Sequence, residues 1–528
     1  MLKRVLWLFM ILAVLAAGYS LWTHRFGVPE DFADMESQYK YGSIGSDHPL
    51  SRAPLPYWIW KALPELFPPS AAIEKSWYEP RNDKQGYAAF GLVTEAVMAR
   101  PRGYTDGQPV FERPIGFSRR KVFGMDFVGI NCALCHLTTL RQSPADKAPQ
   151  VILGGTGNAV DIEQYFRFLF SALSADVLKD TGKVMNAVLK QNKDMSFLQQ
   201  IAYRYVVIPY IRYRVVELKK EFDFINPHRL DPPPVPDFGP GRVDTWAGYK
   251  TAFLDPDQRD KLNGIVDFPP IWNQGVRTGM RLHWDGNTDV LDERNIISAL
   301  ALIGSRLDYL DVPRLTRISE YITWLVPPQY AAWAPTDPIP LSDKAKAALN
   351  KAQEAQTERG KVLFERDCAA CHAAGSLRVG RVEPIADLGT DPLRIHAFTD
   401  QLASALNQLQ TDVWKLRNFR PQNGYANTLL DGIWLRGPYL HNGSVPTLRD
   451  LLKTPAERPK KFCRGTDVYN RKDVGFVSAV DHKNPARPCG EFFLYDTEIR
   501  GNGNQGHTFG TTLSERDKDA LLEFLKGL

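Results

Sequence analysis

The sequence predicts a mainly α-helical protein built from two similar modules that are joined by long irregular loops. The motif Cys-x-x-Cys-His occurs twice, ending at His136 and at His372. In both copies a glycine stands eight residues before the first cysteine, and apolar residues at helical spacing lie between them. Stretches with the composition and end signals of helices follow each motif. We therefore expect a duplicated module in which one helix leads into each motif.

The length and charge of the chain limit its architecture and its partners. With 528 residues, of which 44% are hydrophobic, the chain exceeds the size at which a single hydrophobic core stops growing. Two or three domains are therefore expected. The net charge of +5 comes from 65 basic and 60 acidic residues that are interspersed along the chain. This balance gives no support to nucleic acid as a partner.

The first residues have the pattern of an export signal. Lys3 and Arg4 precede an apolar run from Val5 to Trp22. Residues 1–22 predict a signal peptide or a transmembrane anchor, because the run is intermediate in length between the two classes. A buried N-terminal helix is less favoured, since the basic flank and the apolar run occur together at the start. Export places the rest of the chain in a bacterial periplasm, either anchored in the inner membrane or released.

Composition changes divide the remaining chain into four segments. Residues 23–109 form an N-terminal extension rich in Trp, Tyr and Pro, whose aromatic side chains we expect to pack against the next domain. Residues 110–326 carry the first motif, with insertions, and residues 342–528 carry the second. The proline-spaced segment 327–341 has the composition of a linker.

The expected helices are marked by capping residues. A helical segment over residues 160–222 follows a glycine-rich turn in which Asn158 or Asp161 is the expected cap. A long proline-rich loop comes next. The second module opens with a strong helix-forming stretch after Ser342, and the chain closes with an amphipathic helix after Ser514.

The paired motif is the attachment signature of c-type haem. Two thiols add to the haem vinyl groups, and the adjacent histidine becomes the proximal iron ligand. The predicted attachment residues are Cys132, Cys135, Cys368 and Cys371, and the predicted proximal ligands are His136 and His372. A redox dithiol or a zinc site is less favoured, because neither requires the adjacent histidine in both copies. We expect two covalently bound haem c groups.

Two cysteines remain outside these motifs. Cys463 and Cys489 lie 26 residues apart. In an oxidising compartment such a pair most simply forms a disulfide, and two free buried thiols are the alternative.

The distal ligand of each iron decides between electron transfer and catalysis. The chain has no methionine after Met280, so the haem held by His372 lacks the distal methionine of small cytochromes c. His507 stands seven residues before Ser514, where a distal ligand is expected, and is the first choice; His441 is the second. A haem with two histidine ligands is suited to electron transfer.

The first haem, held by His136, has no clear distal ligand in the sequence. Met125, Met280 and His283 are candidates, and the position can also be open. An open iron would be reactive toward small molecules.

The segment that follows His283 contains two candidates for a role in the chemistry. Trp284 offers an oxidisable ring that can relay electrons between the haems, with a core tryptophan as the alternative. Glu293, between Asp292 and Arg294, offers acid–base chemistry toward a bound peroxide, with a solvated helix face as the alternative.

Four stretches together resemble a known group of proteins. They are the two attachment motifs, "HWDG" with Trp284, "RGPYLHNGSVPTLRDLL" from Arg436 to Leu452, and the C-terminal "GHTFGTTLSERDKDALLEFLK". Over residues 110–528 the chain resembles the bacterial di-haem cytochrome c peroxidase superfamily, and most closely the branch that contains the di-haem rubber oxygenases. The resemblance implies two mainly helical cytochrome c domains, a tryptophan between the haems, one reactive haem, and often a calcium ion at the domain junction.

The resemblance also separates the branches of that superfamily. The peroxidases have a distal methionine, or in related enzymes a tyrosine, fourteen residues beyond the histidine that corresponds to His441; here that position is Pro455. In the rubber oxygenases a histidine near the C-terminus takes this role, and His507 matches it. The peroxidases also carry a distal glutamate where this chain runs into the apolar "IISALALIG". These differences favour an oxygenase-like enzyme over a peroxidase.

We therefore expect an exported di-haem oxidoreductase that activates oxygen or peroxide at the first haem. The alternatives are a membrane-attached electron carrier without catalytic activity and a hydrogen-peroxide-reducing cytochrome c peroxidase. Expected partners are a small redox protein or a quinol-linked electron donor, oxygen or peroxide, and an apolar organic substrate. Polyisoprene is not favoured, because the chain is shorter than expected for a rubber oxygenase.

Overall fold

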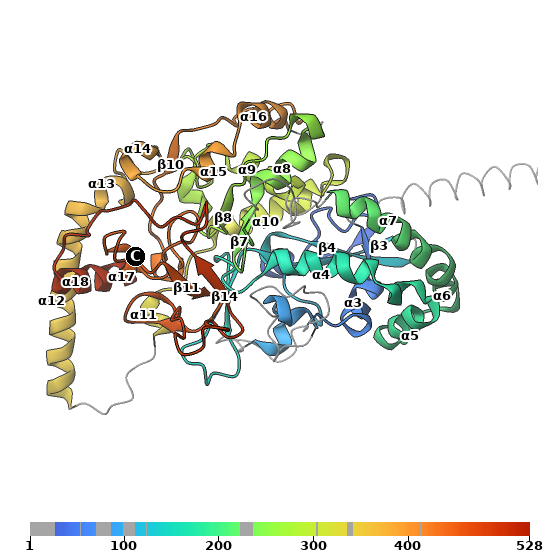
Figure 1. The fold of residues 1–528 in the computed structure, drawn as a ribbon, viewed down its shortest axis with the longest axis horizontal. Coiled ribbons are helices and arrows are strands. Elements are labelled where there is room, and N and C mark those ends of the chain that lie inside the picture. The colour runs from blue at the N-terminus through green and yellow to red at the C-terminus, as the bar shows by residue number, and fades with distance from the viewer. Residues whose placement is uncertain are drawn as a thin grey trace, which may run out of the picture.

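The computed structural model shows an elongated molecule with helices at both ends and short sheets between them (Figure 1). It describes residues 27–52, 54–69, 86–98, 111–122, 124–221, 236–301, 305–334, 342–411 and 414–528. The predicted leader, much of the N-terminal extension and most of the predicted linker lie outside these ranges. In the described part, every helix is too short or too polar to cross a membrane.

A four-stranded antiparallel sheet leads into the first motif. Its strand order is β1-β3-β4-β2, with β1 at Val28–Pro29, β3 at Phe117–Val122, β4 at Met125–Ile130 and β2 at Leu55–Pro56. Strands β3 and β4 form a tight hairpin in which Val122 pairs with Met125. Gly124 lies in the turn with φ +75°, a conformation that favours glycine.

The prediction that a helix leads into the first motif is therefore wrong. Residues 125–130 pair along their whole length with β3, which satisfies their backbone hydrogen bonds in a sheet. The sequence MDFVGI is short and rich in residues that favour strands, so its apolar spacing fits either structure. At Gly129 a Cβ atom would lie 2.4 Å from the Asp47 backbone nitrogen, so this strand position requires glycine.

The N-terminal extension packs against the first motif domain, as its composition predicts. Helix α3, Tyr57–Leu66, carries Trp60, which is 1% exposed. The Trp60 ring stacks on Tyr87 with 4.5 Å between ring centres and also contacts Phe117 of β3. Helix α2, Met35–Tyr41, supplies Tyr39 to a second core. Extension and sheet therefore share buried aromatic surface.

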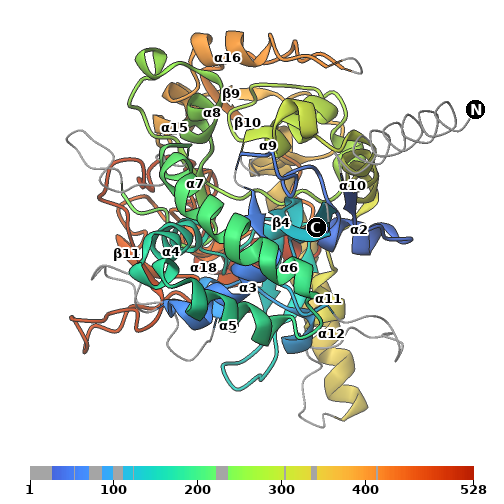
Figure 2. The ribbon, with the colours of Figure 1, turned by 90° about the vertical axis from the view of Figure 1, so that its right-hand side faces the viewer.

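A helical layer covers one end of the molecule, where the sequence predicts helix over residues 160–222. It comprises α4 at Ile162–Ser174, α5 at Thr181–Gln191, α6 at Phe197–Ala202, a π-helical turn at Tyr203–Val207 and α7 at Ile208–Glu221. The predicted cap Asp161 accepts a hydrogen bond from the Gln164 amide at 2.9 Å. Asn158 instead binds the backbone of Thr139. Figure 2 shows this layer in front of the sheet.

The middle of the molecule mixes residues from both predicted motif domains. Its helices are α8 at Thr245–Phe253, α9 at Leu291–Ala301, α10 at Val312–Trp324, α15 at Leu393–His396 and α16 at Asp400–Leu406. Leu402 and Leu406 of α16 share a hydrophobic core with Trp246 of α8 and Ile297 of α9. The two motif-bearing parts of the chain are thus packed into one body.

Small antiparallel sheets hold the loops around the middle and the C-terminal part. Within the described residues they pair β5 (Leu137–Leu140) with β6 (Gln150–Leu153), β7 (Arg242–Asp244) with β8 (Ile265–Asp267), β9 (Val382–Pro384) with β10 (Gly424–Ala426), β11 (Lys461–Arg464) with β14 (Phe493–Asp496), and β12 (Tyr469–Asn470) with β13 (Gly475–Phe476).

Two helices frame the second motif. The predicted caps are confirmed: Ser342 begins α12 (Asp343–Asp367) and Ser514 begins α18 (Glu515–Lys526). The two helices pack closely at Gly360, where a Cβ atom would lie 2.0 Å from the Ala520 carbonyl oxygen. Glycine here lets the helix that carries the motif lie against the terminal helix.

Gly360→Ala is expected to lower the free energy of unfolding by about 1–3 kcal/mol, the usual effect of over-packing. The clash with the Ala520 carbonyl outweighs the roughly 1 kcal/mol that alanine gains over glycine in helix propensity. The measurement is the denaturant midpoint of the haem-loaded protein. Gly182→Ala in α5 is the matched control, because the nearest atom to its Cβ is a flexible Asp180 carboxylate oxygen at 3.3 Å. Equal midpoints for the two variants would contradict the close helix contact.

Candidate functional site

The first motif begins where β4 ends. Asn131 follows the strand and caps the 3₁₀ turn Cys132–Leu134. Its side-chain oxygen accepts a hydrogen bond from the Ala133 amide at 3.0 Å, and its side-chain nitrogen donates to the Gly42 carbonyl at 3.0 Å. The two cysteines of the motif therefore sit on a turn that is fixed at its start.

His136 is held through its backbone and kept uncharged by its surroundings. Its carbonyl oxygen accepts hydrogen bonds from the Tyr39 hydroxyl at 2.8 Å and from the Gly154 amide at 2.8 Å. Burial, together with the positive charge of Arg294, lowers the pKa of the imidazole to about 3. Neutral imidazole is the form that binds a metal, so this histidine fits the predicted proximal ligand.

The cysteine thiols are in environments that disfavour the thiolate. Burial raises the pKa of Cys132 to about 11, and that of Cys135 and of Cys368 to about 12. Redox-active dithiols have depressed pKa values, so these surroundings do not support a dithiol oxidoreductase. Among the described residues no group of three or more His, Cys, Asp and Glu side chains could hold a metal ion, so neither zinc nor the calcium implied by the resemblance gains ligands here.

The second motif follows α12 directly, as the sequence predicts. Cys368 ends that helix, and the short helix α13, Ala369–His372, carries the rest of the motif. The His372 Nδ1 atom lies 2.7 Å from the Thr428 carbonyl oxygen, which makes Nδ1 the protonated nitrogen. A carbonyl partner of this kind orients the ring and leaves Nε2 available for a metal.

His507 lies opposite His372. The centres of the two imidazole rings are 6.4 Å apart. Two metal–nitrogen bonds of about 2 Å, together with the distance of about 1.2 Å from each ring nitrogen to its ring centre, span roughly the same length. The pair therefore fits two axial ligands of one iron, as predicted from the missing methionine.

The backbone fixes the position of His507. Its amide donates to the Leu388 carbonyl at 2.8 Å, and the Arg458 guanidinium donates to its carbonyl at 3.0 Å. The residue adopts φ +45°, which few side chains do, so the loop holds a strained conformation at this point. Burial lowers the pKa of its imidazole to about 4, which keeps the ring neutral.

An apolar cavity with empty volume of about 1500 Å³ connects the second motif with His507. Cys368, Cys371 and His372 line it together with His507. Its apolar lining consists of Leu388, Leu430, Ile433, Leu440, Leu448, Leu451, Leu452, Phe509, Leu521 and Leu525. Such a volume and such walls suit a large planar apolar group held by a few polar contacts.

His441 lines the same cavity but has another partner. Its Nε2 atom lies 2.9 Å from the Tyr425 hydroxyl, and the two rings stack with 4.1 Å between their centres. Burial lowers the pKa of His441 to about 3, and Arg394 and Arg242 add to this effect. Because Tyr425 occupies Nε2, the geometry favours His507 over His441 as the second axial ligand.

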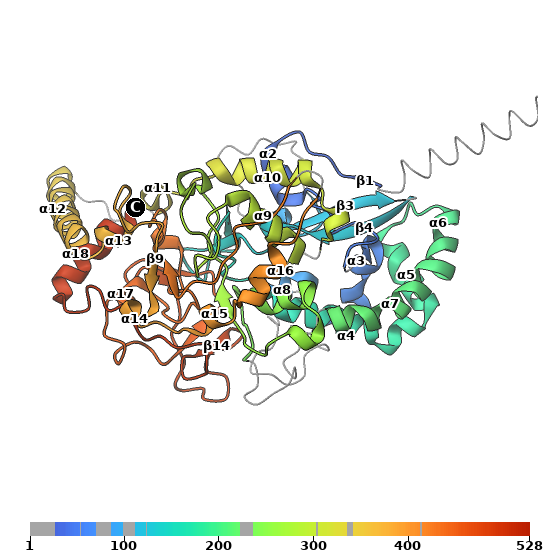
Figure 3. The ribbon, with the colours of Figure 1, turned by 90° about the horizontal axis from the view of Figure 1, so that it is seen from above.

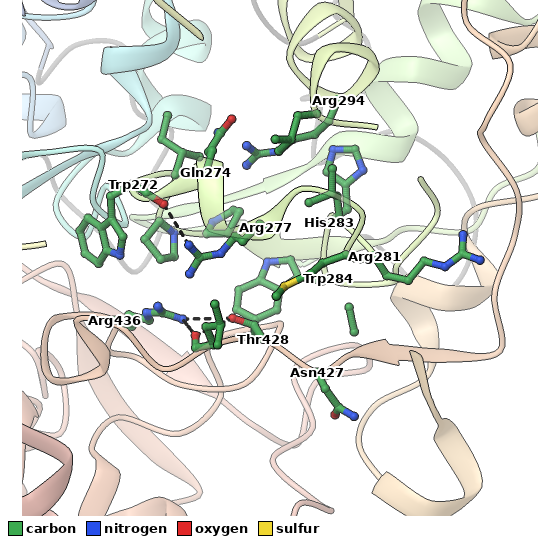
Figure 4. Close-up of a pocket in the computed structure, with 18 residues that line it drawn as sticks. Trp272, Gln274, Arg277, Arg281, His283, Trp284, Arg294, Asn427, Thr428 and Arg436 are labelled. Carbon is green, nitrogen blue, oxygen red and sulfur yellow. Dashed lines mark hydrogen bonds between the residues drawn. The ribbon is translucent and has the colours of Figure 1, made fainter. Parts of the chain in front are cut away.

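Another cavity, with about 730 Å³ of empty volume, lies near the first motif (Figure 4). We call it the first cavity, and we call the apolar cavity at the second motif and His507 the second cavity. Pro269 lines the first cavity. The ring centre of the preceding residue, Phe268, lies 6.1 Å from that of His136, which places the first motif near the cavity. Arg294 and His283 lie together at one side of the cavity. The Arg294 side chain forms no hydrogen bond or ion pair with any described residue, and burial lowers its pKa to about 10.

His283 is the residue among the proposed first-haem ligands that is best placed for that role. It lines the first cavity, and its Nδ1 atom lies 2.8 Å from the Asn287 side-chain oxygen. Met280 also lines this cavity, but its side chain packs against Gly380. A Cβ atom added at Gly380 would lie 2.4 Å from the Met280 Cγ atom. Met125 lies in β4 against a different core.

Trp284 lies between the two cavities and lines both. Its indole nitrogen donates to the Asp267 carbonyl at 2.9 Å, and its own carbonyl accepts from the Ala426 amide at 2.8 Å. Figure 4 shows the ring between the segment that carries Arg277 and the segment that carries Thr428. Trp284 thus forms part of the wall between the two cavities, and its predicted role as a relay stays a prediction.

Glu293 lies away from both cavities. Its carboxylate accepts hydrogen bonds from the Arg417 amide at 2.9 Å, the Asn418 amide at 3.1 Å and the Asn418 side chain at 2.8 Å. The described lining of the first cavity, on the side of Arg294, contains no aspartate or glutamate. The catalytic role predicted for Glu293 therefore gains no support from its position.

The remaining two cysteines form the predicted disulfide. Cys463 of β11 is bonded to Cys489, with 5.3 Å between their Cα atoms. The bond joins β11 to the loop that precedes β14.

Several residues of the site carry no sequence signal that singles them out. Thr428 acts through its carbonyl oxygen, which every residue has. Tyr425 and Arg436 lie within or beside the stretch that carries the resemblance, and this proximity is the only available signal for them. Arg436 donates to Leu429 at 2.8 Å and pairs with Asp431 at 2.7 Å, which braces the wall shared by the cavities.

The fold and the site have the features of a c-type cytochrome-like protein: two Cys-x-x-Cys-His turns with uncharged histidines, the second of which lines an apolar cavity. Comparison with known proteins agrees with this class. Residues 424–463 match a family model described as RoxA-like, cytochrome c-like. This segment contains Tyr425, Thr428, Arg436 and His441, which line the second cavity.

Two curated relatives come from Sinorhizobium fredii. The chain is 29% identical over 275 residues to the uncharacterized protein y4iM, a match that covers 46% of this chain and 57% of the relative. It is 36% identical over 129 residues to the uncharacterized protein y4iJ, a match that covers 22% of this chain and 20% of the relative. The chain thus spans about half the length of the first relative and a fifth of the second.

Glu293→Gln is expected to lower the free energy of unfolding by about 1–3 kcal/mol, because a neutral amide accepts hydrogen bonds less well than the carboxylate it replaces. Haem content and absorption spectra should stay unchanged. Thermal unfolding and visible spectroscopy of the haem-loaded protein measure both. Asp292→Asn, at the exposed neighbouring position, is the control. Unchanged stability together with lost turnover would instead indicate a catalytic carboxylate.

Proposed function

We propose that the chain is an exported di-haem c-type cytochrome oxidoreductase. Cys132, Cys135 and His136 would hold one haem, and Cys368, Cys371, His372 and His507 would hold the other. The observation that carries the proposal is the facing pair His372 and His507 across an apolar cavity, with ring centres 6.4 Å apart.

The second site has the features of an electron-transfer site. Two neutral histidines can occupy both axial positions of one iron, which leaves no position for a substrate. The apolar lining excludes water and the Thr428 carbonyl fixes the ring of His372. Both effects tune a redox potential without opening the iron to small molecules.

The first site has the features expected of a reactive centre. His136 supplies one neutral imidazole, and the half-buried Arg294 places a positive charge at the cavity wall. Reduction of oxygen or peroxide places negative charge in the cavity, where a fixed cation is effective because water is excluded. The haem, when bound, supplies the redox chemistry, and these side chains supply binding and electrostatics.

Trp284 connects the two sites in this proposal. Its ring lines both cavities and is fixed by hydrogen bonds at the indole nitrogen and at the backbone. An aromatic ring held in this way can pass electrons from the haem at His372 to the haem at His136. A small redox protein or a quinol-linked donor would supply those electrons from outside.

The cavity chemistry favours oxygen over peroxide as the reactant. Heterolysis of peroxide benefits from a general acid–base group near the iron. The described lining of the first cavity contains no aspartate or glutamate, and Glu293 is bound to residues 417 and 418. Apolar residues such as Trp272, Leu282 and Leu291 would contact the hydrophobic part of an organic substrate, and the arginines of the same lining would contact its polar part.

His283 supports a second candidate function, that of an electron carrier. It lines the first cavity, and Asn287 holds its Nδ1 atom as metal-bound histidines are commonly held. If His283 binds the first iron, both haems are saturated and the protein transfers electrons only.

His507→Ala is expected to convert the second haem from low spin to high spin, because one axial imidazole is removed. Electron paramagnetic resonance of the oxidised protein measures this change. His441→Ala should leave that haem low spin, since Tyr425 already occupies the His441 Nε2 atom. The exposed His482→Ala is a further control. A low-spin second haem in His507→Ala would contradict the ligand assignment.

The oxidised wild-type protein is expected to show one low-spin haem and one haem that responds to added peroxide, or to oxygen after reduction. The same spectroscopy measures this response. Two low-spin haems that do not respond would favour the electron carrier. His283→Ala distinguishes the cause: a responsive haem that appears only in this variant would identify His283 as the ligand that closes the first site.

A further inference from the structure

One end of the molecule carries an exposed apolar surface that the haem sites do not explain. We call it the aromatic face. It consists of the exposed apolar side chains of α6, the π-helical turn and α7: Phe197, Leu198, Ile201, Tyr205, Val206, Tyr210 and Tyr213. Four of them are more than two-thirds exposed, namely Phe197 at 74%, Leu198 at 76%, Tyr205 at 71% and Tyr213 at 73%.

The opposite side of the same helices is buried in the protein. Tyr203, Val207, Ile208 and Ile211 belong to the hydrophobic core and are at most 5% exposed. A surface helix in a soluble domain has an apolar side toward the core and a polar side toward water. Here both sides are apolar, so the aromatic face lacks the polar covering that a water-facing helix has.

The charged residues within the segment that carries the aromatic face are basic. Residues 195–216 contain no aspartate or glutamate and include Arg204, Arg212 and Arg214, while Asp194 and Glu217 flank the segment. Tyrosine, phenylalanine and arginine together are typical of segments that lie in the interface of a bilayer with anionic lipids. The composition is less suited to a basic redox protein, which would be repelled.

The aromatic face lies where the described chain begins. The Gln199 side chain of α6 donates to the Gly124 carbonyl at 2.6 Å, in the turn between β3 and β4. Val28 of β1 pairs with Lys121 next to that turn and is 66% exposed. Figures 1 and 3 show β3, β4 and α6 at the same end of the molecule. The apolar run that ends at Trp22 therefore joins the described chain beside the aromatic face.

We infer that the aromatic face rests on the surface of an anionic lipid bilayer. The aromatic side chains would enter the interface, and the exposed Arg204 would contact lipid phosphates. Arg212 instead donates hydrogen bonds to the Leu178 carbonyl and the Thr181 hydroxyl. The second motif, between α12 and α18 at the other end of the molecule, would then point away from the membrane (Figure 1). A second copy of the chain or an apolar protein partner would not explain why the N-terminal apolar run joins at this end.

The test uses the full-length, haem-loaded protein in vesicles of phosphatidylcholine and phosphatidylglycerol. A lipid with a photoreactive diazirine in its acyl chain reports contact by covalent labelling, which mass spectrometry locates. We expect labelling of peptides that cover residues 197–213. Trp324 and Leu377 are the internal controls, because they are 80% and 94% exposed but lie outside the aromatic face. Equal labelling of the face and of these controls would overturn the inference.

A pair of variants separates contact from misfolding. Tyr205→Glu with Tyr213→Glu should reduce lipid labelling of residues 197–213 several-fold, because carboxylates are repelled by anionic lipid. Both side chains are exposed, so haem content and absorption spectra should remain unchanged. Trp324→Glu with Leu377→Glu is the matched control and should leave labelling as in the wild type. Protein–protein crosslinks through residues 197–213, with no lipid label, would instead assign the face to a second copy or another protein.

Discussion

The arrangement of the two cavities depends on a buried ion pair that joins distant parts of the chain. Asp267 of β8 pairs with Arg464 of β11 at 2.5 Å, and both side chains are almost fully buried. The Asp267 carbonyl holds the Trp284 indole, and the Asp267 amide donates to the His441 carbonyl at 2.9 Å. Burial raises the pKa of Asp267 to about 6, although Arg464 and Arg242 oppose the shift, so it stays ionised at neutral pH. A paired charge of this kind is costly to separate, and it therefore fixes the tryptophan between the two cavities.

Sequence signals that act over a few residues predicted their structures correctly. The caps Asp161, Ser342 and Ser514 begin helices where expected, and Cys463 and Cys489 are bonded. The capping signals are local, since a cap needs only the next turn of helix. The disulfide was predictable because only two cysteines remain outside the two motifs. The strand before Cys132 was not predicted, because its identity depends on pairing with β3 and not on its own six residues. The shared core of α16 and α8 depends on contacts between segments about 150 residues apart, and no local pattern encodes it.

The candidate site was predictable to the extent that its chemistry resides in side chains. His507 follows from the absence of a methionine and from its place before the terminal helix, and the structure brings it to His372. The groups that orient these ligands are mostly backbone atoms, such as the carbonyls of Thr428 and Asp267. Backbone groups leave no trace in a sequence, because every residue supplies them. Glu293 shows the reverse case: a carboxylate at a plausible position binds a neighbouring loop, which only the three-dimensional structure reveals.

The two attachment motifs are alike in sequence, so the difference between their sites must come from what surrounds them. The second motif follows a long helix and faces a histidine across an apolar cavity. The first motif follows a strand and lies near a cavity lined by the half-buried Arg294 and by His283. In the function proposed above, covalent attachment would fix each haem equally well, and the residues opposite each motif would set its reactivity. Because Trp284 borders both cavities, we propose that one site can supply electrons to the other without sharing its ligands. The chain thus repeats one motif but places different residues opposite each copy. In the proposed function, those residues determine what each site can do.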